Sequence, residues 1–187
     1  MVLLVNACVR DESRTRRLAD ALIKRFSFNV TEVKLSYIRF PVADAAFLAK
    51  RDSLIAAGAW SDPMFDLARQ FAEAETIIIA APYWDLSFPA VLKQYFEQIN
   101  VMGITFQYTP EGTPEPLCRA KKLFYVTTAG GAFVPDEFGF GYVKTMAQSF
   151  YGIDDVELIK AVGLDIYGAD IDQIMNDAIM EITNHAG

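Results

Sequence analysis

The chain has 187 residues, a net charge of −7, and 52% hydrophobic against 22% charged side chains. These values indicate one globular domain over residues 1–187, with enough apolar side chains to bury a core. The negative charge argues against binding to nucleic acid or to an anionic membrane surface, and no stretch reaches the ~18 apolar residues that span a bilayer.

The predicted elements alternate between strands and helices along the chain. Short apolar runs predict buried strands, and apolar repeats at three and four residues predict amphipathic helices. Strands are expected at residues 2–7, 30–36, 76–82, 122–131 and 156–162. Helices are expected at residues 13–26, 47–57, 63–73, 89–100, 137–151 and 171–183. Parallel strands joined by helices require helices on both faces of the sheet, which predicts an α/β domain.

Three loops of this sheet carry unusual sequences. In open α/β sheets, ligands bind beyond the carboxyl ends of the strands, where the strand order reverses. The loops after the first, third and fourth expected strands read CVRDESRT, PYWDLSF and TTAGGAF. We therefore expect these three loops to form a ligand site.

The first loop is basic in an otherwise acidic chain. Its arginines are Arg10, Arg14, Arg16 and Arg17. Basic side chains at a helix start oppose the helix dipole, whereas a bound phosphate would make them favourable. Ser13 is a natural N-cap and Thr15 adds a hydroxyl, which favours a phosphate site. The alternative is that Asp11 and Glu12 neutralise a solvated face. The nucleotide-binding motifs GxxxxGK[ST] and GxGxxG are absent.

The other two loops supply hydroxyls, glycines and flat side chains. Thr127 and Thr128 precede a pair of glycines that allows a ligand to approach the backbone. Tyr83 and Trp84 offer an aromatic surface. An ordinary strand-end turn and an aromatic corner of the core are the alternatives for these two loops. Taken together, a phosphate site, a polar middle and a flat apolar surface describe FMN.

Three segments of the sequence carry a resemblance to a known family. APYWDLSFPAVLKQYFEQI, GITFQYTPEG and VTTAGGAF resemble the flavodoxin-like NAD(P)H dehydrogenase (quinone) family, which includes FMN-dependent NADH-azoreductases. The resemblance extends over almost the whole chain. It implies a flavodoxin-like doubly wound five-stranded parallel sheet of order 2-1-3-4-5. It also implies a homodimer that binds FMN and reduces quinones or azo compounds by two electrons from NAD(P)H.

The resemblance also assigns site residues by position. The phosphate would be held by Arg10, Ser13 and Thr15. The flavin ring would lie against Pro82, Tyr83, Trp84, Asp85, Leu86, Thr127, Thr128, Ala129, Gly130 and Gly131. The substrate side would be formed by Phe106, Tyr108 and Phe133, with Tyr108 a candidate proton donor. The family commonly has Asn, an aromatic residue and Gly where this chain has Asp85, Leu86 and Ser87. An acid there would lower the flavin reduction potential.

The expected chemistry depends on the cofactor. The one histidine, His185, lies near the C-terminus, and the sequence shows no Ser-His or Cys-His nucleophile system and no metal-ligand cluster. Because donor and acceptor are both flat, we expect them to use the same flavin face in turn, which gives ping-pong hydride transfer. A flavodoxin-type electron carrier, an NAD(P)H-dependent FMN reductase and a flavin-free interaction module are the alternatives.

Two further expectations concern a loop and the location of the protein. Residues 104–117 are expected to form a long connection without regular structure, an ordered lid or an interface, with a plain surface loop as the alternative. Cys8 and Cys118 form no CxxC motif, and the first residues do not resemble a signal peptide, so we expect a reduced, cytoplasmic protein.

Overall fold

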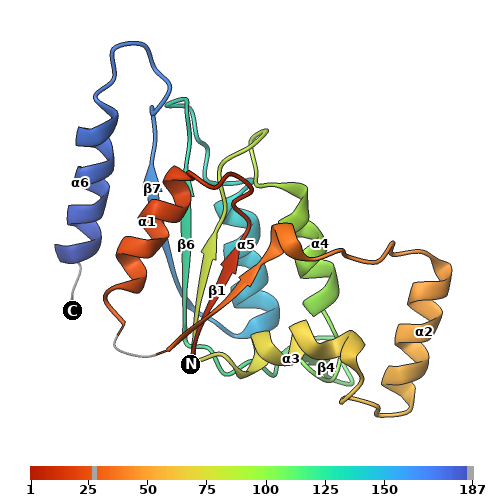
Figure 1. Ribbon diagram of the computed structural model, residues 1–187. Helices are drawn as coiled ribbons and strands as arrows, with labels where there is room; N and C mark the ends of the chain where they lie inside the picture. Colours follow the sequence, from red (N-terminus) through yellow and green to blue (C-terminus); the bar gives the residue numbers. More distant parts are fainter. Residues whose placement is uncertain (27–28, 185–187) are drawn as a thin grey trace.

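The computed structural model describes residues 1–26 and 29–184, so His185 lies outside the described residues. Five parallel strands form the main sheet (Figure 1). They are β1 (Val2–Asn6), β2 (Val30–Lys34), β3 (Thr76–Ala80), β6 (Lys122–Thr128) and β7 (Asp155–Ala161). Their order is β2-β1-β3-β6-β7. This arrangement fits the expected flavodoxin-like order, because two short strands elsewhere account for the shift in numbering.

Helices cover both faces of the sheet, as expected. Buried side chains of α1 (Arg14–Ile23) and α6 (Ile171–Asn184) pack on one face. Those of α3 (Asp66–Glu73), α4 (Ala90–Ile99) and α5 (Phe140–Met146) pack on the other. Helix α2 (Ala45–Ala56) has no buried residue and stands away from the sheet (Figure 1).

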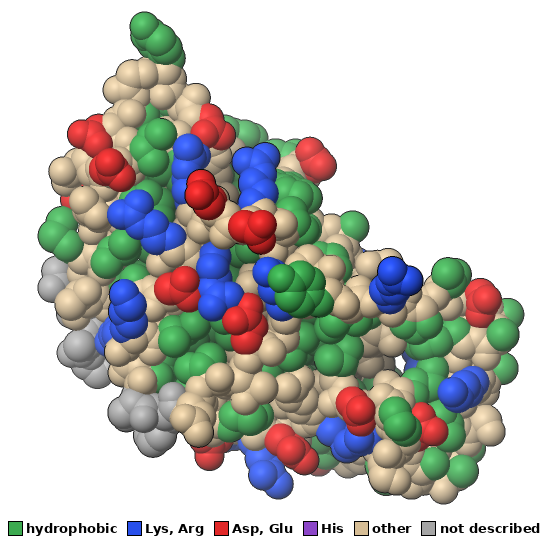
Figure 2. Space-filling model, in the orientation of Figure 1, with side chains coloured by type: hydrophobic (Ala, Val, Ile, Leu, Met, Phe, Trp, Pro, Cys, Tyr) green, Lys and Arg blue, Asp and Glu red, His purple; other side chains and the backbone are tan. Residues whose placement is uncertain are grey.

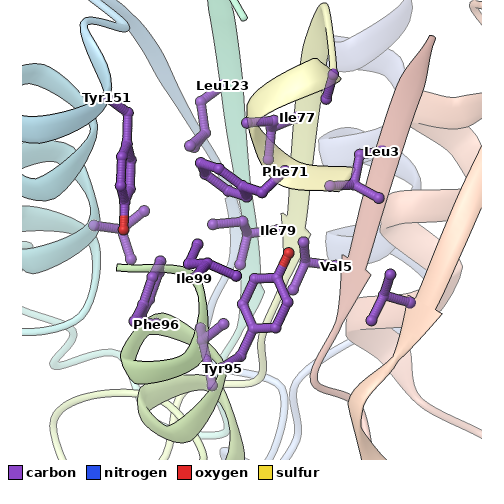
Figure 3. Close-up of a cluster of buried hydrophobic side chains, with 14 of the residues drawn as sticks. Leu3, Val5, Phe71, Ile77, Ile79, Tyr95, Phe96, Ile99, Leu123 and Tyr151 are labelled. Carbon is purple, nitrogen blue, oxygen red and sulfur yellow. The ribbon is translucent and has the colours of Figure 1, made fainter. Parts of the chain in front are cut away.

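The larger core lies between the sheet and helices α3, α4 and α5 (Figure 3). Phe71 packs edge-on against Tyr151 with 4.8 Å between ring centroids. The Tyr151 hydroxyl donates to Asn100 Oδ1, so the polar group of this buried side chain has a hydrogen-bond partner. Alternate residues of the central strands, such as Ile77 and Ile79, point into this core, and the intervening Ile78 points into the other. Both faces of the central strands are buried, which explains their unbroken apolar sequences.

The structure corrects two sequence predictions. The helix expected from residue 137 begins at Phe140, because Gly139 and Gly141 lie at its start, and it ends in a π-helical turn at Ala147–Tyr151. Residues 104–117 are not an irregular loop. They contain an antiparallel hairpin of β4 (Phe106–Tyr108) and β5 (Pro114–Pro116). This small sheet has only two strands, so its prolines sit at an edge and interrupt no interior ladder.

The hairpin lies at the amino ends of the main strands, near the N-terminus of the chain (Figure 1). Phe106 packs against Phe150 with 5.1 Å between ring centroids. Phe150 lies in the π-helical turn that precedes β7. The expected ligand loops lie at the opposite end of the sheet. Among the described residues, no helix has both the length and the apolar character needed to cross a bilayer.

Candidate cofactor site

A pocket of about 320 Å³ opens at the carboxyl ends of the strands. The loops after β1, β3 and β6 meet there, as the sequence predicted, and the loop after β7 forms part of the wall. The predicted residues that line it are Arg10, Ser13, Thr15, Pro82, Tyr83, Trp84, Thr128, Ala129 and Gly130. The site therefore has its expected place in the fold.

The start of α1 forms the basic side of the pocket. Ser13 is the N-cap, and its hydroxyl accepts a hydrogen bond from the Arg16 amide at 3.2 Å. The remaining amides of the first turn have no helical partner, so the helix end attracts an anion. Arg10 and Arg14 line the pocket beside it. Within the described ranges, Arg10 forms no ion pair or hydrogen bond, and its guanidinium is free to bind a ligand.

A network of hydrogen bonds joins the basic loop and α1 to strands β1 and β2. Asn6, at the end of β1, accepts from the Cys8 amide at 2.9 Å and donates to Glu32 at 2.8 Å. Arg16 also donates to Glu32. Desolvation alone would raise the pKa of Glu32, but the hydrogen bonds from Asn6 and Arg16 hold it below its usual value. Glu32 is therefore a carboxylate at neutral pH and fixes the strand end to the helix.

Three arginines of this loop are paired, although not with the acids next to them. Arg14 pairs with Asp165, and Arg17 lies 3.7 Å from Asp172 at the start of α6. Arg16 bonds with Asp20 in addition to Glu32. Neutralisation by Asp11 and Glu12, the sequence-based alternative, is not what the structure shows.

The aromatic side of the pocket comes from the loop after β3. The Tyr83 amide donates to the Thr128 carbonyl at 3.0 Å, which continues the pairing of β3 with β6 beyond the strands. Trp84 and Ser87 then bond to each other through both backbone groups and close a two-residue turn. Asp85 and Leu86 occupy that turn with φ of 50° and 65°. Positive φ at both central positions is the requirement of a type I′ turn, for which Leu is an unfavourable residue.

The loop after β6 gives the pocket its third side. Thr128 Oγ1 lies 2.7 Å from Thr15 Oγ1, so the two loops are joined by a buried hydrogen bond. Ala129 and Gly130 follow at the pocket wall.

Several predicted residues lie outside this pocket. Asp85 and Leu86 line a neighbouring groove with Glu137, Phe138 and Tyr142. Thr127 points to the opposite side of β6 from Thr128, and its buried hydroxyl has no hydrogen-bond partner among the residues that the structure describes. Gly131 and the 77% exposed Phe133 lie beyond the wall.

The two hairpin residues are also separate from the pocket. Phe106 is buried against Phe150, and Tyr108, which is 49% exposed, lies on the same hairpin. Within one chain, the hairpin that carries them lies at the end of the sheet opposite the pocket (Figure 1).

The pocket also contains residues that the sequence did not assign to it, namely Val9, Glu12, Arg14, Leu164 and Asp165. Leu164 and Asp165 follow β7, the strand next to β6. The carboxyl ends of all parallel strands meet at one edge, so the loop after the fifth strand was a detectable candidate.

The titratable groups near the pocket favour binding over direct chemistry. Burial raises the pKa of the Cys8 thiol, so it is protonated at neutral pH and is a poor nucleophile. Desolvation and the charges of Asp136 and Glu137 raise the pKa of the Tyr83 hydroxyl. These groups remain neutral, so the pocket is suited to holding a ligand that itself carries the chemistry.

A doubly wound sheet with a ligand pocket at its switch point defines a flavodoxin-like protein. The chain belongs to the family described as having a flavodoxin-like fold, whose profile matches residues 1–186.

The similarity extends to curated relatives and a solved structure. An FMN-dependent NADH:quinone oxidoreductase of Clostridium beijerinckii is 35% identical over 93% of this chain and 90% of the relative. One of Coprothermobacter proteolyticus is 36% identical over 91% and 89%. The crystal structure of an azoreductase from Bacillus anthracis str. Sterne superimposes with a TM-score of 0.84 at 24% identity, over 98% of this chain and 96% of that one.

Proposed function

We propose that this protein is an FMN-dependent NADH:quinone oxidoreductase that also accepts azo compounds. The names of relatives that match nearly the whole chain support this proposal. The structural observation that carries it is a single pocket with a basic helix start on one side and an aromatic loop on another.

The residues of the pocket fit FMN. The phosphate would bind the free amides at the start of α1 together with Ser13 and Arg10, because a helix N-terminus and a guanidinium both favour an anion. The flavin ring would lie against Tyr83 and Trp84. Thr15 would act indirectly, since its hydroxyl is already bonded to Thr128.

Bound FMN would supply two-electron hydride chemistry between NADH and the acceptor. The protein would provide an apolar mouth for flat molecules, formed by the exposed side chains of Trp84 at the pocket and of Leu86 and Phe138 in the neighbouring groove. Donor and acceptor would use this mouth one after the other. Asp85 and Glu137, in the adjoining groove, would favour acceptors without negative charge.

We further propose a homodimer that works in the cytoplasm. The exposed Tyr108 and Phe133 and the unburied helix α2 are apolar surfaces that a second subunit would cover. Phe106 and Tyr108 would reach a substrate only at the partner's pocket. The free thiols of Cys8 and Cys118 support a reducing compartment. An active monomer in a sedimentation experiment at assay concentration would contradict the dimer.

The proposed function is tested by reconstitution. Protein stripped of ligands should bind FMN, oxidise one equivalent of NADH per flavin without an acceptor, and oxidise NADH continuously only when a quinone is added. Arg10→Ala with Ser13→Ala should bind FMN far more weakly, since charge-assisted bonds contribute about 1.5–3 kcal/mol each. Arg119→Ala, at an exposed position before β6 and away from the pocket, is the matched control and should bind FMN normally. Unchanged FMN affinity in the double variant would place the phosphate elsewhere.

A further inference from the structure

The Arg14 guanidinium is bonded across the pocket to the loop that follows β7. Its Nη1 donates to Asp165 Oδ1 at 2.8 Å and to the Leu164 carbonyl at 3.3 Å. Arg14, Leu164 and Asp165 all line the pocket. Arg14 is therefore held by an anion of the protein itself, beside the helix start where a phosphate would bind.

The backbone fixes Asp165 in this place. The Leu164 amide donates to the Ala129 carbonyl at 3.2 Å, and the Asp165 amide donates to the Gly130 carbonyl at 2.9 Å. These bonds join the loop after β7 to the loop after β6. A Cβ at Gly130 would collide with the Asp165 carboxylate, which lies directly over the Gly130 backbone. Gly130 is thus required for this contact.

The charges on the pocket wall are balanced. Two acids, Glu12 and Asp165, accompany two bases, Arg10 and Arg14. Figure 2 shows the same mixture of basic and acidic side chains over the face where α1 lies. A phosphate dianion is repelled by Asp165, and it can bond to Nη1 of Arg14 only by displacing that carboxylate.

The ion pair is weak enough to be exchanged. The side chain of Arg14 is 40% exposed and that of Asp165 is 71% exposed. Pairs at such positions are screened by solvent and contribute little to stability. A doubly charged phosphate beside the helix start would therefore displace Asp165 from Arg14, although the residual repulsion would weaken its binding.

We infer that Asp165 competes with the FMN phosphate for Arg14 and so limits how tightly and how long the cofactor is held. This inference rests on the proposed function. It concerns binding alone and is tested without turnover. The probes are FMN and riboflavin, which share the ring and the ribityl chain but differ in the phosphate.

The test is the dissociation constant of each flavin for the unaltered protein and for Asp165→Asn. The variant removes the charge and keeps the size of the side chain. FMN should bind about threefold to tenfold more tightly, equivalent to roughly 0.7–1.4 kcal/mol, with most of the change in the release rate. Riboflavin binding should not change. The gain for FMN should shrink as salt is added.

Two further variants make the result specific. Asp172→Asn removes the same charge from the partner of Arg17, outside the pocket wall, and should leave FMN affinity unchanged. In a background of Arg14→Gln, Asp165→Asn should give a smaller gain, because the guanidinium for which the two anions compete is absent.

Three outcomes would overturn the inference. Weaker FMN binding in Asp165→Asn would mean that Asp165 orients Arg14 toward the phosphate. Weaker binding of both flavins would mean that Asp165 accepts a hydrogen bond from the ribityl chain. Unchanged FMN affinity would mean that the pair has no effect on the cofactor. Failure of the unaltered protein to bind FMN at all would instead overturn the proposed function, and the inference with it.

Discussion

Thr15 on α1 and Thr128 at the end of β6 share a buried hydrogen bond, with 2.7 Å between their hydroxyl oxygens. The two residues are far apart in the chain. Their bond fixes the basic helix start against the loop that carries Ala129 and Gly130. This bond links two walls of the pocket directly, in addition to the contacts that Arg14 makes through Leu164 and Asp165.

Removing both of these hydroxyls should destabilise the protein by less than the sum of the two separate removals. Thr15→Val leaves the Thr128 hydroxyl buried without a partner, at a loss of about 1–3 kcal/mol in the free energy of unfolding. The double variant Thr15→Val with Thr128→Val should lose less than the sum of the two single variants. Urea denaturation measures these values, and Thr113→Val on the exposed hairpin is the control. Strictly additive losses would show that the hydroxyls do not interact.

The turn at Asp85 and Leu86 should be improved by glycine. Leu86 has a φ of 65° and is 47% exposed, so it bears the strain of a left-handed backbone and buries little. Leu86→Gly should stabilise the protein by roughly 0.5–1 kcal/mol, because relief of about 1–2 kcal/mol exceeds the entropy lost by glycine on folding. Thermal unfolding tests this expectation. Leu86→Ala keeps the strain and should show no gain; an equal gain in both variants would exclude backbone strain as the cause.

The same substitution also tests whether Leu86 takes part in binding the acceptor. If its side chain contacts the acceptor, Leu86→Gly should raise the KM for the quinone while the KM for NADH changes less. Equal changes in both values would argue against a specific contact between Leu86 and the acceptor.

Glu32 should make stability depend on pH in the acid range. Its pKa in the folded protein lies below its usual value, so its contribution is present above the unfolded pKa of about 4.3 and is lost as the pH falls through the folded value. Glu32→Gln should therefore lose about 1 kcal/mol at pH 7 and progressively less below pH ~4. Glu111→Gln, in the exposed hairpin turn, is the control. A constant difference across this pH range would contradict the assignment.

The kinetics should show that NADH and the acceptor use the mouth in turn. Initial rates measured while both concentrations are varied should give parallel lines in a double-reciprocal plot. Intersecting lines would mean that both molecules are bound together, which a shared face does not allow.

The sequence predicted those features that depend on local pattern. The alternation of apolar runs with helical repeats was sufficient for the sheet and its two layers. Ser13 could be predicted as an N-cap from its residue type at the start of a helix. Tyr83, Trp84 and Gly130 could be predicted as site residues because their loops follow the ends of expected strands. The resemblance to the quinone reductase family is confirmed by the curated relatives, which are named FMN-dependent NADH:quinone oxidoreductases.

Features that depend on contacts between distant residues could not be predicted in this way. The hairpin at Phe106–Tyr108 and Pro114–Pro116 was missed because proline is disfavoured in strands, and only its two-stranded pairing accommodates it. The pairing of Arg14 with Asp165 depends on backbone bonds between the loops after β6 and β7. Thr127 and Thr128 point to opposite faces because side chains alternate along a strand, but which of the two faces α1 depends on how β6 lies in the sheet.

The most direct test of the proposed function is the visible spectrum of the FMN-loaded protein during anaerobic addition of NADH. We expect the flavin absorption band to bleach as NADH is consumed in equal amount and to return when a quinone is added. A protein that binds no FMN, or one whose flavin band is unchanged by NADH, would contradict it.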